Sequence, residues 1–199
     1  MNVGTRDKRS YNNRKGKNML RRMLIIANPG RQGEENYCEG VNKDVTSYQN
    51  FFTSKSGGAW EESEIRILKQ PFPWQVDSAL QWLIPAAYSM VIFCGHGYSR
   101  KDGTTVVELQ SGYDYDSEKF FKGADKHSVI LDCCRAVVEE ELLEHARKDG
   151  TILFECEINR ETARKRFDEA VSRCSSGQII LYSCDLEETA GDDSRNGGV

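Results

Sequence analysis

Val91-Ile-Phe-Cys-Gly-His-Gly97 and Ser128-Val-Ile-Leu-Asp-Cys-Cys-Arg135 decide the fold that this sequence predicts. In both stretches an apolar run ends abruptly in polar residues capable of catalysis. Such a run is typical of a strand buried on both faces of a parallel sheet. The carboxyl ends of parallel strands meet at one edge, where the sites of open α/β sheets are built. We therefore expect a histidine and a cysteine to meet there as base and nucleophile.

Strand-like and helix-like segments alternate along the rest of the chain. Including these two, apolar runs predict strands at residues 23–27, 64–68, 88–94, 128–132 and 178–183. Helical spacing predicts helices at residues 41–52, 73–83, 137–148 and 159–173. We expect a small excursion at the sheet edge over residues 104–109 and a short helical turn over residues 117–121. This order predicts an α/β fold with a mainly parallel sheet and helices on both faces.

The composition is that of an ordinary globular protein. A chain of 199 residues with net charge −4 suits one domain and makes no general case for a nucleic-acid partner. Positive charge is concentrated in residues 1–21, which we expect to be a flexible basic arm preceding a folded domain of residues 22–199. No apolar stretch approaches the roughly 20 residues of a membrane span, and no signal-peptide core follows the arm. We therefore expect a cytoplasmic protein without a membrane partner.

The chain has seven cysteines, an odd number that suits reduced thiols in a reducing compartment. There is no CxxC motif, and Cys133 and Cys134 are adjacent, which suits a tetrahedral zinc site poorly. We therefore expect no metal site. Five cysteines are expected to be small buried hydrophobic residues, namely Cys94, Cys133, Cys156, Cys174 and Cys184.

The residues around Cys134 suit peptide-bond chemistry. His96 stands between two glycines that leave room for a substrate chain. The amides of Gly97 and Cys134 can together receive the negative charge that develops on a scissile carbonyl. Asp132, two residues before Cys134, points to the same side if the chain stays extended. A carboxylate there selects a basic substrate side chain, although Asp132 can also simply accept backbone hydrogen bonds.

The motifs Cys94-Gly-His-Gly97 and Asp132-Cys-Cys-Arg135 resemble those of the caspase-like cysteine peptidases of clan CD, peptidase family C14. Within that family they are most similar to the metacaspase and bacterial caspase-like branch. The resemblance covers about residues 22–199 and implies a caspase-like three-layer sandwich. It implies that Cys134, the second cysteine of a D-x-C pattern, is the nucleophile and that His96 is its partner in a Cys-His dyad.

Gly40-Val-Asn-Lys-Asp44 resembles the family segment whose aspartate joins the specificity pocket. The resemblance therefore implies that Asp44 and Asp132 line the S1 pocket and favour Arg over Lys at P1, although Asp44 can equally cap the first helix. His127 and His145 are expected to be structural or surface residues.

The resemblance implies a cysteine endopeptidase, made as a zymogen, that acts on protein or peptide substrates and responds to an activating protein partner. Bacterial relatives often act in stress or antiphage defence. Basic residues between the nucleophile and the last strand are candidate self-cleavage sites or, equally, the charged faces of helices. They are Lys148, Arg164, Lys165, Arg166 and Arg173.

An acidic cluster after the last strand is the one candidate cation site. Some metacaspases bind Ca²⁺, but the cluster lacks the alternating ligands of a calcium loop, which favours a solvated loop. We expect no cofactor, with Ca²⁺ as the alternative. The cluster comprises Asp185, Glu187, Glu188, Asp192 and Asp193.

Two positions depart from the family pattern. Cys94 stands where the family usually has serine, and Arg135 stands where metacaspases favour histidine. Family members also continue past Val199, so we expect this chain to lack C-terminal elements. Two alternatives stay open: a catalytically silent caspase-like domain that binds partners, and an unrelated flavodoxin-like domain with coincidental motifs.

Overall fold

The computed structural model describes residues 19–135 and 158–188. Most of the basic arm and the helix predicted over residues 137–148 lie outside the described residues. So do several single residues discussed above, namely His145, Lys148, Cys156, Asp192 and Asp193.

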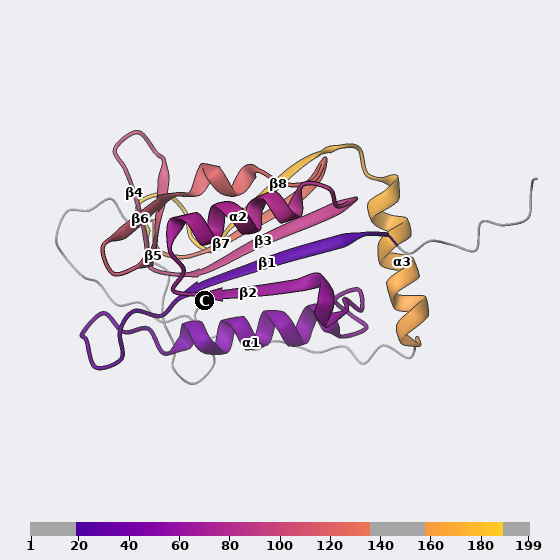
Figure 1. Ribbon diagram of the computed structural model, residues 1–199, viewed down its shortest axis with the longest axis horizontal. Helices are drawn as coiled ribbons and strands as arrows, with labels where there is room; N and C mark the ends of the chain where they lie inside the picture. Colours follow the sequence, from indigo (N-terminus) through magenta and orange to yellow (C-terminus); the bar gives the residue numbers. More distant parts are fainter. Residues whose placement is uncertain (1–18, 136–157, 189–199) are drawn as a thin grey trace, which may run out of the picture.

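The described residues form a five-stranded sheet of order β2-β1-β3-β7-β8, in which every neighbouring pair is parallel. The predicted α/β class is therefore confirmed. The bounds of each strand differ from those of the predicted apolar run by at most two residues at either end. Figure 1 shows the strands pointing toward one end of the molecule, with α3 across the opposite end. The strands are β1 (Arg21–Asn28), β2 (Ile65–Lys69), β3 (Tyr88–Gly95), β7 (Lys126–Asp132) and β8 (Gly177–Tyr182). The helices are α1 (Gly40–Thr53), α2 (Pro73–Leu83) and α3 (Arg160–Arg173), with short 3-10 helices η1 (Glu62–Glu64) and η2 (Ser117–Phe121).

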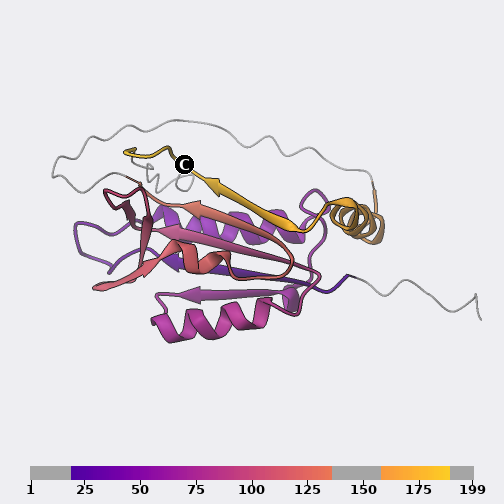
Figure 2. The same cartoon turned by 90° about the horizontal axis from the view of Figure 1, so that it is seen from above.

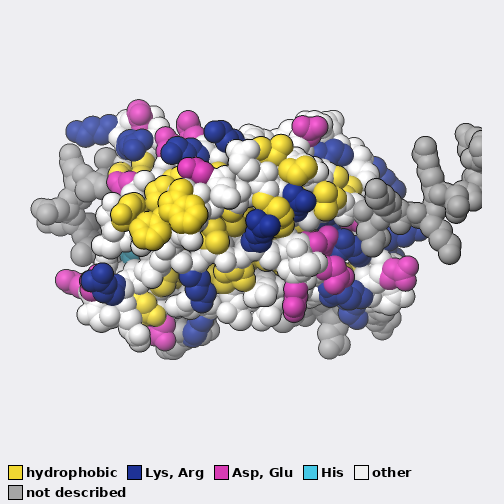
Figure 3. Space-filling model, viewed as in Figure 1, with side chains coloured by type: hydrophobic (Ala, Val, Ile, Leu, Met, Phe, Trp, Pro, Cys, Tyr) yellow, Lys and Arg dark blue, Asp and Glu magenta, His cyan; other side chains and the backbone are white. Residues whose placement is uncertain are grey.

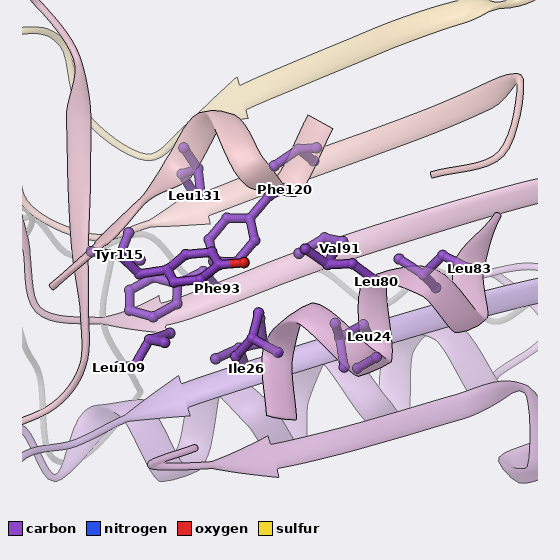
Figure 4. Packing of buried hydrophobic residues seen from close by; sticks show 14 of the residues in the cluster. Leu24, Ile26, Leu80, Leu83, Val91, Phe93, Leu109, Tyr115, Phe120 and Leu131 are labelled. Carbon is purple, nitrogen blue, oxygen red and sulfur yellow. The ribbon is translucent and has the colours of Figure 1, made fainter. Parts of the chain in front are cut away.

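Helices cover both faces of the sheet because successive strand residues point to opposite sides. Leu24 and Ile26 of β1 pack in one core with α2, whereas Met23 and Ile25 pack in a second core with α1. Figure 2 shows the arrangement from above, with β8 as an edge strand. In Figure 4 the side chains of the α2 core, among them Phe93, point toward one another between the sheet and the helix.

A second, antiparallel sheet stands at the carboxyl ends of the parallel strands. It consists of β4 (Gly97–Ser99), β5 (Thr105–Gln110) and β6 (Tyr113–Asp116). Residues 104–109 were expected as an excursion at the edge of the main sheet, and that expectation is wrong. β5 is the central strand of this separate sheet, because it pairs with β4 on one side and β6 on the other.

Arg21 begins β1 and does not belong to the arm. Its side chain is fully buried, and its guanidinium lies 3.2 Å from Glu64 and 3.5 Å from Asp168. Arg164 of α3 binds the same Glu64 at 2.6 Å. This network ties α3 to the amino ends of the strands, opposite the end where the site residues gather.

On the face shown in Figure 3, Lys and Arg are interspersed with Asp and Glu, and hydrophobic side chains gather over the region of α2. The exposed aromatic residues include Phe72 and Trp74 at the start of α2 and Tyr113 of β6. Among residues 19–135 and 158–188, no helix is both long and apolar enough to span a membrane.

Candidate active site

His96 occupies the junction between β3 and β4, at the carboxyl edge of the parallel sheet. It is half-buried, and its backbone oxygen accepts a hydrogen bond from the Glu108 amide at 2.9 Å. The preceding Gly95 has φ +147°, and a Cβ atom there would lie 2.5 Å from the Asn28 oxygen of β1. Only glycine tolerates that approach, so the packing of β3 against β1 requires glycine immediately before His96.

The loop that follows β1 lies against the imidazole of His96. The Asn28 side chain supports this loop, since its Oδ1 accepts from the Gly30 amide and its Nδ2 donates to the Glu108 backbone oxygen. Cys38, at the end of the loop, places its Sγ 3.7 Å from His96 Nε2. Cys38 was not among the residues predicted for the site. Its position after the first strand, at the edge where the site was expected, was the available signal.

Cys134 lies at the same edge as His96 because β3 and β7 are neighbours. Cys94 pairs with Asp132 in the register of these strands, and His96 and Cys134 each follow their paired residue by two positions. A Cβ atom on Gly97 would lie 3.0 Å from the Cys134 backbone oxygen. The structure therefore brings the two motifs together at one edge of the sheet.

The two adjacent cysteines have different environments. Cys133 is 2% exposed, and burial, followed by neighbouring thiols, raises its pKa. Its Sγ faces Gly97, where an added Cβ atom would lie 2.7 Å away. Cys134 is half-buried and so more accessible than Cys133. Because the thiolate is the reactive form, Cys134 is the better candidate nucleophile.

Arg135 anchors the backbone directly after Cys134, a role that was not predicted from the sequence. Its buried guanidinium donates from Nε to Thr105 Oγ1 at 3.1 Å and stacks 3.8 Å from the Tyr182 ring centre. Its backbone amide donates to the Glu188 oxygen at 2.9 Å. The exit from β7 is thus fixed to both the small sheet and the loop after β8.

Asp44 and Asp132 both lie near the buried Cys94, beneath this edge. Each is 8% exposed, and both carboxylates, after burial, raise the pKa of the buried Cys94 thiol. Asp44 is inside α1, whose N-cap is Glu39, so the interpretation of Asp44 as a helix cap is wrong. The structure therefore collects two carboxylates around Cys94.

The carboxylate of Asp132 accepts hydrogen bonds from two hydroxyl groups. The Tyr48 Oη of α1 donates to its Oδ2 at 3.2 Å, and Ser183 donates from the segment after β8. Burial raises the pKa of Asp132 to about 6, although both hydroxyl groups act in the opposite direction. Buried carboxylates of this kind are costly until a cation pairs with them.

Other candidate residues lie away from this edge or play structural roles. His127 is buried, and its ring contacts the Ser89 hydroxyl at 2.7 Å and the Phe120 carbonyl at 2.8 Å. Cys174 was expected to be buried but is exposed at the end of α3. Four of the basic residues proposed as cleavage sites lie in α3, which favours their interpretation as a helix surface. They are Arg164, Lys165, Arg166 and Arg173.

In the part of the chain that the structure describes, no group of three or more His, Cys, Asp or Glu side chains is arranged to hold a metal ion. The described acidic residues after β8 instead stabilise their own turn, since Glu188 Oε2 accepts from the Asp185 amide at 3.1 Å.

A parallel sheet that presents a thiol and an imidazole at its carboxyl edge defines an α/β protein with a cysteine-histidine site. The model of the caspase domain, peptidase family C14, matches residues 20–199, and the chain belongs to this family of cysteine peptidases. Comparison with curated proteins finds no match. Family membership confirms the predicted caspase-like fold, implies a protein substrate, and excludes the unrelated flavodoxin-like alternative.

Proposed function

We propose that the protein is a cysteine endopeptidase that cleaves after Arg and, less efficiently, after Lys. The observation that carries this proposal is the pair of buried carboxylates, Asp44 and Asp132, around Cys94 and next to both site motifs. A guanidinium can satisfy both carboxylates because it presents five donors in a planar fork. A P1 arginine bound there would hold its carbonyl carbon near Cys134.

In the proposed reaction the Cys134 thiolate attacks the carbonyl carbon and forms a carbon-sulfur bond. The carbon-nitrogen bond breaks as His96 donates a proton to the leaving amine. A water molecule, deprotonated by His96, then hydrolyses the thioester and restores the thiol. We assign the amides of Gly97 and Cys134 as donors to the oxyanion.

The alternative is a caspase-like domain that is catalytically silent. The observation that favours it is the 3.7 Å contact between His96 Nε2 and Cys38 Sγ, because a second thiol competes for the imidazole. The variant Cys38→Ala removes this competitor. Faster alkylation of Cys134 in this variant would identify the contact as an inhibitory one in an otherwise competent site.

The test uses fluorogenic peptides with Arg, Lys or Asp at P1, with and without Ca²⁺. We expect cleavage after Arg and Lys that is abolished in Cys134→Ala and largely retained in the matched control Cys133→Ala. Cleavage after Asp would contradict the acidic pocket. Absence of cleavage under every condition would contradict the endopeptidase proposal and favour the silent domain.

A further inference from the structure

Tyr48 is the described residue of α1 that reaches the carboxylate of β7. It lies one helical turn after Asp44, and its ring stacks with Phe52 at a centroid distance of 6.5 Å. The stacking fixes the direction of the side chain, so that Oη donates to Asp132 Oδ2 at 3.2 Å. From the sequence, Tyr48 was placed only within the helix predicted over residues 41–52.

We infer that Tyr48 is a positioning residue for substrate specificity: its hydroxyl holds Asp132 in the ionised state that binds a basic P1 side chain. This inference rests on the proposed function. It goes beyond that function because it assigns a residue of α1 control over the pH range in which the pocket accepts a cation.

The groups around Asp132 come from four elements. Tyr48 faces it from α1, Cys94 faces it from β3, and Ser183 donates from the segment after β8. Asp44, on the same helix as Tyr48, acts on Tyr48 and Cys94. Cys133, which follows β7, also lies close enough to interact with it. These partners include no Lys or Arg. The charged form of Asp132 is therefore stabilised by the hydroxyl groups of Tyr48 and Ser183, whereas burial of the carboxylate destabilises that form.

Tyr48 remains a donor at every pH at which the enzyme would work. Burial, followed by the charge of Asp132, raises the pKa of its hydroxyl far above the usual range. Asp132, in contrast, titrates at about pH 6. Removing a hydrogen bond to a charged group raises the pKa of that group by about one unit or more.

The variant Tyr48→Phe keeps the ring and its stacking and removes only the hydroxyl. With the midpoint of Asp132 moved up by about one unit, ionised Asp132 falls about ninefold at pH 5 and about twofold at pH 7. It is almost unchanged at pH 8. We expect kcat/KM for a P1 arginine substrate to fall by these factors, mainly through KM.

The experiment measures kcat/KM for a P1 arginine peptide from pH 5 to pH 8. The matched control is Tyr115→Phe, which removes the same kind of bond, 2.6 Å from Tyr115 Oη to Asp77 Oδ1, on the opposite face of the sheet. Alkylation of Cys134 by iodoacetamide, which does not use the pocket, reports the nucleophile separately.

A ratio of Tyr48→Phe to wild-type activity that rises with pH, with unchanged alkylation, would support the inference. A ratio that is constant over this range, or equal to that of Tyr115→Phe, would overturn it while leaving the proposed function intact. If the wild-type protein cleaves no basic substrate, the proposed function fails and the inference fails with it.

Discussion

Replacing Asp132 by asparagine measures how far the ionised, buried carboxylate lowers the free energy of unfolding. Burial raises the pKa of Asp132 from its ordinary value of 3.8 to about 6. At pH 3 and below the group is largely protonated in the folded and the unfolded chain, so its ionisation costs almost nothing, and near pH 4 the cost is still below about 1 kcal/mol. Above pH 6 the folded chain must carry the charge, and the stabilisation provided by the protonated form is lost. A shift of about two units corresponds to about 3 kcal/mol.

We therefore expect Asp132→Asn to unfold with a free energy within about 1 kcal/mol of that of wild type near pH 4 and higher by up to about 3 kcal/mol at pH 8. Asparagine keeps the shape of the side chain and an oxygen that accepts from Tyr48. Urea unfolding, followed by the fluorescence of tryptophans that include the buried Trp60, measures this difference from pH 4 to pH 8. The exposed Asp125→Asn serves as the control, with a difference near zero at each pH. A difference for Asp132→Asn that is independent of pH, or a loss of stability at pH 8, would refute the reasoning.

Three further substitutions test other parts of the account. Gly97→Ala places a Cβ atom 2.7 Å from Cys133 Sγ and 3.0 Å from the Cys134 oxygen, so we expect activity to fall by at least tenfold and unfolding in urea to show a loss of about 1–3 kcal/mol; wild-type values for both would contradict the packing. Arg135→Lys keeps the charge but cannot both bridge to Thr105 and stack on Tyr182, and we expect a lower kcat with little change in KM. Steady-state kinetics that show an effect on KM alone would place Arg135 in substrate binding instead. Glu64→Gln leaves the buried Arg21 without its closest carboxylate, and we expect the free energy of unfolding in urea at pH 7 to fall by about 3 kcal/mol. Burial alone would raise the pKa of Glu64, but its hydrogen bonds and the charges of Arg21 and Arg164 outweigh burial and lower it. The loss therefore shrinks at low pH, where Glu64 of the wild-type protein becomes protonated.

The parallel sheet could be predicted because its strands are recognisable without their neighbours. β1, β3 and β7 each contain an unbroken apolar run and are largely buried, and such runs have few alternative structures. β4 and β6 could not be predicted. They span three and four residues, too few for a period to be visible, and they exist because β5 pairs with both.

The candidate site was predictable where its residues follow strands in the sequence. His96 and Cys134 come directly after apolar runs, so their place at one edge follows from the sheet. Tyr48 could not be assigned a polar partner, because its hydrogen bond joins residues 84 positions apart. Arg21 was misassigned for the same reason, since it stands among the charges of the arm while its partners Glu64 and Asp168 lie far along the chain.

One measurement tests the central claim most directly: labelling with a peptide that carries Arg at P1 and a thiol-reactive group in place of the scissile bond. Mass spectrometry of the digested protein then locates the adduct. The account predicts one adduct, on Cys134, that is lost in Cys134→Ala and much slower in Asp132→Asn. An adduct on Cys38 or Cys133, or labelling that proceeds equally well with Asp at P1, would contradict it.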